Sequence, residues 1–167
     1  MKILLVNKYF NMHGGSETYF FGLADLLRQA GHEVIFFAMQ DEKNLPCEQS
    51  AYFVSNVEFN GELTAAQKLK AAFRMVYSFE AKKKISALIE KEKPDIIHIN
   101  LFHRVLTASI VDAAKKHGIP VVFTMHDLNC VCPNHVMLDH GKICEACLHG
   151  NYWNCVKRAC SKDSRAK

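Results

Sequence analysis

Two adjacent glycines follow the first apolar run of the chain and precede a helical pattern. Residues 3–6 are continuously apolar, and Gly14 and Gly15 come shortly afterwards. A ligand can approach bare backbone N–H groups closely, and the N-terminus of the following helix favours an anion. Ser16 is expected to cap that helix. The arrangement predicts a phosphate-binding turn, and a tight turn without a ligand is the alternative.

The glycine pair differs from the two common phosphate-binding motifs. A dinucleotide fingerprint requires Gly-x-Gly-x-x-Gly, and a P-loop requires a Gly-Lys-Ser/Thr sequence. Neither occurs around Gly14. By itself the pair therefore does not identify a nucleotide class.

Other polar side chains follow apolar segments that are predicted as strands. His98 and Asn100 end the segment "DIIHIN", and His126 and Asp127 follow "GIPVVFTM". Because ligands of parallel α/β sheets bind beyond the carboxyl ends of the strands, we expect these residues to gather with the glycine pair along one edge. For His98 the alternative is a purely structural histidine at a strand end.

The elements that must position these residues alternate between strands and helices. Continuous apolar runs predict buried strands, and apolar residues at the helical period predict helices between them. Right-handed crossovers then give an α/β fold with a doubly wound, mostly parallel Rossmann-like sheet. Strands are expected at 3–6, 34–38, 95–100 and 121–125, with a weaker one at 52–59. Helices are expected at 20–27 and 106–114, and over 63–93 as two helices that meet near 77–79.

The net charge of +4 is concentrated near the C-terminus. From Gly141 onward there are six Lys or Arg residues and two acidic residues, so the rest of the chain is neutral. A basic tail suits an acidic lipid surface, a nucleic acid or simply solvent. No secretory signal and no apolar run long enough to span a membrane are visible, so we expect a cytoplasmic protein.

Cysteines are concentrated in an irregular segment, residues 128–167. A cytoplasmic location favours thiols or metal ligands over disulfides among the seven cysteines. Two close pairs, with one further cysteine as an alternative ligand, suit a structural zinc ion. The pairs are Cys144 with Cys147 and Cys155 with Cys160, and the alternative ligand is Cys132. Reduced thiols and disulfides remain the alternatives.

Three segments together carry a resemblance to a known family. They are "HGGSETYFFGLADLLRQAGHEV", "KPDIIHIN" and "GIPVVFTMHD", which occur in this order, followed by a cysteine-bearing stretch. The chain resembles the N-terminal, acceptor-side domain of family 4 glycosyltransferases, which have the GT-B fold and use nucleotide sugars. The resemblance covers essentially the whole chain.

The resemblance implies roles for the residues identified above. The catalytic residue nearest to the transferred sugar would be His126. Residues that bind or shape the site of the donor and substrate would be Gly14, Gly15, Ser16, Glu17, His98, Asn100 and Asp127. The donor would be a UDP- or GDP-sugar, and no catalytic metal is implied.

The domain organisation expected from the resemblance is incomplete. Residues 1–127 would form the Rossmann-like glycosyltransferase domain, and residues 128–167 a cysteine-rich extension. The donor-binding domain with its Glu-x7-Glu pair is missing, so we expect a chain that is inactive alone. It would be a truncated gene product or one half of an enzyme whose C-terminal half is a separate partner.

The expected reaction transfers a sugar from the donor to a glycan or a lipid-linked acceptor, with retention of configuration at the sugar. The protein itself is expected to contact the inner face of the membrane peripherally. The first alternative is a non-enzymatic Rossmann-like module whose zinc knuckle docks on a partner. The second is a nucleic-acid-binding protein, and the neutral charge of residues 1–141 argues against it. We therefore expect no nucleic-acid partner.

Overall fold

The computed structural model describes residues 1–56 and 64–160, and only the backbone of residues 65–70 within this part. The chain divides into two compact units, Met1–Thr124 and Met125–Lys167. This division falls close to position 127, where the cysteine-rich extension is predicted to begin. Each unit is described by itself.

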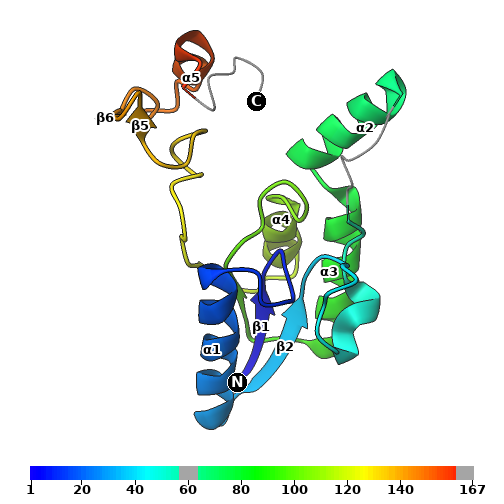
Figure 1. The fold of residues 1–167 in the computed structure, drawn as a ribbon. Coiled ribbons are helices and arrows are strands. Elements are labelled where there is room, and N and C mark those ends of the chain that lie inside the picture. The colour runs from blue at the N-terminus through cyan, green and yellow to red at the C-terminus, as the bar shows by residue number, and fades with distance from the viewer. Residues whose placement is uncertain (57–63, 161–167) are drawn as a thin grey trace. The chain divides into compact units, whose positions relative to one another are not determined.

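The first unit is built on a parallel four-stranded sheet with the order β2-β1-β3-β4. Figure 1 shows β1 and β2 side by side in this sheet. The strands are β1 (Lys2–Val6), β2 (Glu33–Phe37), β3 (Ile96–Ile99) and β4 (Val121–Phe123). Their continuous apolar sequences are those of strands that are covered on both faces. The sheet confirms the predicted α/β, Rossmann-like fold class.

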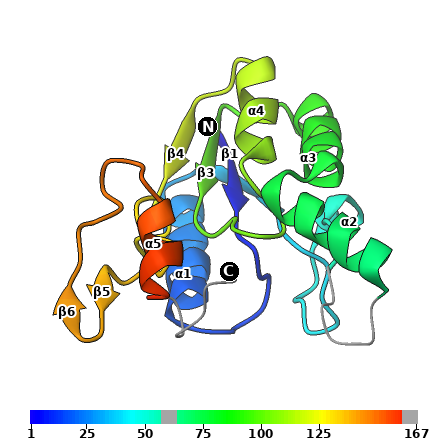
Figure 2. The same ribbon diagram turned by 90° about the horizontal axis from the view of Figure 1, so that it is seen from above.

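Helices cover both faces of this sheet (Figure 2). Helix α1 (Gly15–Gln29) lies on one face, and α3 (Phe79–Glu92) and α4 (Ser109–Lys116) lie on the other. In the described residues, no helix is both long and apolar enough to cross a membrane.

Alternation along the strands divides the core into two clusters. In β1, Leu4 and Val6 pack with side chains of α3 and α4, whereas Ile3 and Leu5 pack with Phe20 of α1. Both sets are buried because successive strand residues point to opposite faces. A single apolar strand thereby anchors helices on both sides of the sheet.

The predicted third strand is wrong within the described residues. A short 3-10 helix, η1 (Glu48–Tyr52), occupies its beginning, and only Val54 forms a bridge, with Met39. Residues 57–59 of that prediction lie outside the described part.

The long helical segment divides into two helices, as predicted. Helix α2 (Ala65–Val76) ends shortly before α3, and the Ser78 hydroxyl caps α3 by accepting a hydrogen bond from the Ala81 N–H at 3.1 Å. Gly31, which follows the C-terminus of α1 closely, has φ +81°, a conformation that glycine adopts without strain. Local capping chemistry therefore sets both boundaries.

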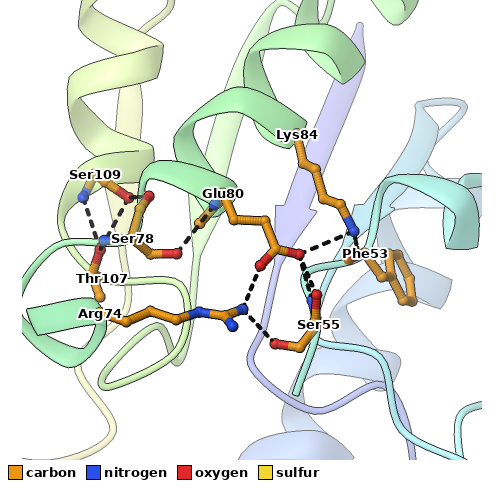
Figure 3. Close-up of polar contacts among 9 residues, drawn as sticks. Phe53, Ser55, Arg74, Ser78, Glu80, Lys84, Thr107 and Ser109 are labelled. Carbon is orange, nitrogen blue, oxygen red and sulfur yellow. Dashed lines mark hydrogen bonds and ion pairs between the residues drawn. The ribbon is translucent and has the colours of Figure 1, made fainter. Parts of the chain in front are cut away.

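A polar cluster fixes the junction of α2 and α3 to the carboxyl-end edge of the sheet (Figure 3). Arg74 of α2 donates hydrogen bonds to Glu80 and, at 2.8 Å, to the carbonyl of Ser55, which follows the Val54 bridge. Beside it, the Ser78 N–H donates to the Thr107 hydroxyl at 3.0 Å, in the loop that follows β3. The junction is thus joined to two loops at the same edge.

Glu80 is the centre of this cluster, and its replacement is expected to destabilise the first unit. Burial alone raises the pKa of Glu80, but hydrogen bonds from Ser55 and the charges of Arg74 and Lys84 outweigh it, so the pKa lies below its ordinary value of 4.5. Glu80→Gln should cost about 1.5–3 kcal/mol near neutral pH, measured by urea unfolding.

The pH dependence follows from the direction of that shift. Because the folded-state pKa is lowered, the stabilisation by Glu80 is complete above its ordinary pKa of 4.5 and is lost as the pH falls through the folded value. The difference between wild type and Glu80→Gln should therefore shrink in acid. Glu90→Gln is the matched control on α3, since the Glu90 side chain is 69% exposed and should change stability little. An equal effect of both variants would contradict this role.

Candidate functional site

The carboxyl-end edge of the sheet carries a buried asparagine that joins three segments. Asn7 follows β1 directly and is fully buried. Its amide nitrogen donates to the Tyr9 carbonyl at 2.8 Å and to Glu17 Oε1 at 3.0 Å. Its amide oxygen accepts a hydrogen bond from the Leu101 N–H at 3.1 Å. Asn7 therefore ties the end of β1 to the first turn of α1 and to the loop after β3.

Glu17 is the acidic residue at this junction, and it is 2% exposed. Besides Asn7, it accepts a hydrogen bond from the Ser16 hydroxyl at 3.0 Å. Its position in the first turn of α1 is favourable for a negative charge, because the helix dipole is positive there. The structure thus places Glu17 inside the junction, where it orients the start of the helix.

The prediction that Ser16 caps α1 is wrong. The N-cap residue is Gly14, no side chain caps the helix, and the Ser16 hydroxyl bonds to Glu17 instead. The helix begins at Gly15, two residues earlier than a cap at Ser16 requires, so Ser16 already lies within the first turn.

The glycine pair leaves open space at the start of α1. Gly14 is extended, with φ −170°, so its backbone conformation does not demand glycine. A Cβ at Gly15 would have no atom within 4 Å. The first backbone hydrogen bond of the helix runs from the Thr18 N–H to the Gly14 carbonyl at 3.1 Å. The preceding amides of the first turn are available to an anionic group that occupies this space.

Two predicted residues of β3 lie near the same edge. His98 is half-buried, and its Nε2 lies 2.7 Å from the Thr124 hydroxyl at the end of β4. Its neighbours Ile97 and Ile99 pack toward α3 and α4, so His98 lies on the face that α1 covers. Asn100 is fully buried, and its N–H donates to the Val6 carbonyl at 2.8 Å.

His126 and Asp127 belong to the second unit. His126 is exposed, and the Asp127 carboxylate accepts hydrogen bonds from the Asn129 N–H at 3.0 Å and side-chain amide at 2.6 Å. These contacts form a tight turn soon after β4. The gathering of His126 and Asp127 with the glycine pair stays a prediction, because the units are described separately.

The second unit contains the predicted zinc ligands. It has a hairpin of β5 (Leu138–Asp139) and β6 (Lys142–Ile143), followed by α5 (Trp153–Arg158). The thiols of Cys155 and Cys160 lie 3.3 Å apart, and burial together with Cys155 raises the pKa of Cys160 to about 11. Among the described residues, no three His, Cys, Asp or Glu side chains form a ready metal site.

The sequence prediction of the site omitted Asn7. Its signal was the one that identified Asn100: a polar residue directly after a buried apolar strand. Asn7 stands immediately after "KILLV", but the sequence prediction assigned the binding role at this strand end to the glycine pair a few residues later. Asn7 connects Glu17, in the first turn of α1, to the loop after β3.

Comparisons with known proteins agree with this architecture. A sequence model described as Glycosyltransferase Family 4 matches residues 13–156. MurG of Acinetobacter baumannii is similar with a TM-score of 0.49 and 19% identity, and the match covers 75% of this chain and 35% of that one. The glycosyltransferase VinC in complex with dTDP gives a TM-score of 0.48 and 20% identity, covering 77% of this chain and 35% of VinC. No curated protein sequence matches.

Proposed function

Because the chain belongs to glycosyltransferase family 4, we propose that it is the acceptor-side, N-terminal domain of a retaining glycosyltransferase. Its chain spans 35% of the length of MurG and of VinC. The donor, a UDP- or GDP-sugar, binds between this domain and a donor-binding half that carries the remaining contacts. The match of the family model over residues 13–156 is the observation that carries the proposal.

On the donor side, the first turn of α1 contacts the diphosphate. The N–H groups at Gly15 and the two residues after it belong to the positive end of the helix, and a Cβ at Gly15 would meet no atom within 4 Å. Glu17 does not contact the donor; with Asn7 it fixes the direction of the turn. A phosphate held by backbone amides and by basic groups of the other half needs no catalytic metal.

His126 lies near the transferred sugar in this proposal. It follows β4 closely in the chain, as a residue at the carboxyl-end edge of the sheet should. Positioning both partners of a transfer reaction requires groups on both sides of the sugar. We therefore expect no turnover from this chain without a donor-binding half, whether that half is a separate chain or a continuation of this one.

On the acceptor side, the junction of α2 and α3 offers an apolar surface at the same edge of the sheet. Phe73, Val76 and Phe79 are 69%, 78% and 78% exposed. They line a hollow of about 480 Å³ together with Arg74 and the neighbouring residues of the junction. Arg74 is paired with Glu80, which also lines the hollow, so the apolar side chains are the feature that suits a lipid-linked acceptor at the inner face of a membrane. A glycan acceptor is the other member of the proposed substrate class.

Substitution of Gly15 tests the donor contact separately from folding. Gly15→Asp puts a carboxylate where the diphosphate is proposed to bind, and repulsion together with the lost contact should weaken UDP or GDP binding by about tenfold or more. Stability should be unchanged or slightly higher, since an acidic residue in the first helical turn is favourable by about 0.3–1 kcal/mol. Nucleotide-induced shifts of the amide NMR signals of residues 14–17 measure the binding.

The control is Gly15→Ala, which adds a Cβ without charge where no atom lies within 4 Å. It should fold normally and lose less affinity than Gly15→Asp. If neither UDP nor GDP at millimolar concentration shifts the amides of residues 14–17, the proposed donor contact is wrong. That result would favour the non-enzymatic binding module.

A further inference from the structure

The second unit lacks a hydrocarbon core. Among its described residues, 125–160, the only buried ones are Cys132, Cys147 and Cys155. Its large apolar side chains lie outside, with Ile143 82% and Trp153 69% exposed. Three thiols do not bury enough surface to hold a segment of this size together.

Other interactions in this unit are weak or local. The hairpin has two residues in each strand, and α5 has six residues. The ion pair between Arg158 and Asp139, at 3.2 Å, involves an Arg158 side chain that is 54% exposed. Exposed pairs contribute about 0–1 kcal/mol, and units below about 40 residues usually depend on disulfides or metals. The fold of this segment therefore calls for a further stabilising group.

Five cysteines of the second unit lie in or next to its turns and its helix. Cys132 donates its N–H to the Leu128 carbonyl at 2.9 Å, in a turn that follows the Asp127 carboxylate. Cys144 directly follows β6, and the next turn, closed by a 2.9 Å hydrogen bond from the Gly150 N–H to the Cys147 carbonyl, positions Cys147. Helix α5 contains Cys155, and Cys160 is the second residue after this helix.

Two of the five thiols are in direct contact. The thiol of Cys160 donates to that of Cys155 at 3.3 Å. Cys132, Cys147 and Cys155 are buried, and Cys144 and Cys160 are half-buried. All five are free thiols, whereas Cys130 is exposed and Cys47 belongs to the first unit.

We propose that the second unit binds one zinc ion through four thiolates of the cluster Cys132, Cys144, Cys147, Cys155 and Cys160, and that this ion replaces a hydrophobic core. Four thiolates in a tetrahedral arrangement are a typical structural zinc site. The thiols lose their protons as the ion binds, and they draw together to Zn–S distances of about 2.3 Å. The fifth cysteine stays a thiol. The inference concerns the second unit only and goes beyond the proposed donor contact at Gly15.

The metal content of the purified chain tests the proposal. The full chain, produced under reducing conditions with zinc in the medium, should retain about one zinc per molecule by elemental analysis. Cobalt(II) in place of zinc should give the intense visible bands of a tetrahedral tetrathiolate. Chelation should make residues 125–160 sensitive to limited proteolysis while the first unit keeps its thermal transition.

Serine variants identify the ligands. Cys147→Ser and Cys155→Ser should each lose most of the zinc, and the control Cys130→Ser should keep it. In a variant that still binds metal, the cobalt spectrum reports the number of sulfur ligands. A lower number than in the wild type identifies the replaced cysteine as a ligand, even if the variant is less stable. Loss of zinc in Cys144→Ser or in Cys160→Ser would in either case support the proposal and identify a further ligand.

Three outcomes would overturn the proposal. The first is less than about a tenth of an equivalent of zinc in chain never exposed to chelator. The second is zinc content that none of the five serine variants changes. The third is an iron–sulfur chromophore, or intramolecular disulfides among these cysteines, in chain prepared under reducing conditions. None of these would bear on the amide shifts at Gly15, so the two proposals fail separately.

Discussion

Replacing Asn7 with alanine is expected to destabilise the first unit by about 3–5 kcal/mol. The variant removes three hydrogen bonds at once and leaves the carboxylate of Glu17, 2% exposed, without its amide partner. Each buried polar group left unpaired costs about 1–3 kcal/mol, and a charged one costs more. Small domains are stable by only about 5–15 kcal/mol, so this loss should be visible as a large fall in the urea midpoint.

Two variants separate the contribution of Asn7 from that of its neighbours. Ser16→Ala removes only one hydrogen bond to Glu17 and should cost about 0.5–1.5 kcal/mol. Asn7→Asp places a second carboxylate against Glu17, where the amide now lies 3.0 Å from Oε1, and should also be strongly destabilising near neutral pH. An effect of Asn7→Ala no larger than that of Ser16→Ala would show that this junction does not hold the edge together.

Phe20→Ala is expected to cost about 3–5 kcal/mol, because it opens a cavity under α1. Phe20 is fully buried and contacts three other rings, with its centroid 6.3 Å from Phe10, 5.2 Å from Phe21 and 5.7 Å from Phe36. These rings form much of the cluster between α1 and the sheet. Chemical unfolding of the full chain measures the loss.

The matched control for Phe20→Ala is Leu26→Ala on the same helix. The Leu26 side chain is 64% exposed, and alanine is a good helix former, so stability should change by less than about 0.5 kcal/mol. Since Phe20 anchors the helix whose first turn carries Gly15, Phe20→Ala should also weaken the proposed nucleotide contact. A loss of stability without any loss of nucleotide binding would place the donor elsewhere.

The sequence was sufficient for the layered fold. Continuous apolar strands with helices between them predicted the parallel sheet, and the division of the long helical segment near Ser78 is confirmed by the boundary between α2 and α3. The family, too, was recognisable from short segments around the glycine pair and the later strands, and the family model confirms it. The weak strand at 52–59 failed in its described part because β-forming residues there had no neighbouring strand beyond one bridge.

The candidate site was predictable only in part. The glycine pair, His98 and Asn100 are found at or near the carboxyl-end edge of the sheet, as the pattern of elements required. The inward direction of Glu17 and the role of Asn7 were not predictable from the local sequence.

What the sequence alone determined is therefore the set of elements, their order and the family, since hydrophobic periodicity and capping residues act over a few neighbouring positions. What only the tertiary structure decided is which polar groups are buried together. Asn7 and Leu101 are distant in sequence and meet because β1 and β3 pair in one register, with Val6 opposite Ile99. Such a contact is set by the alignment of strands across the sheet, which no local pattern encodes.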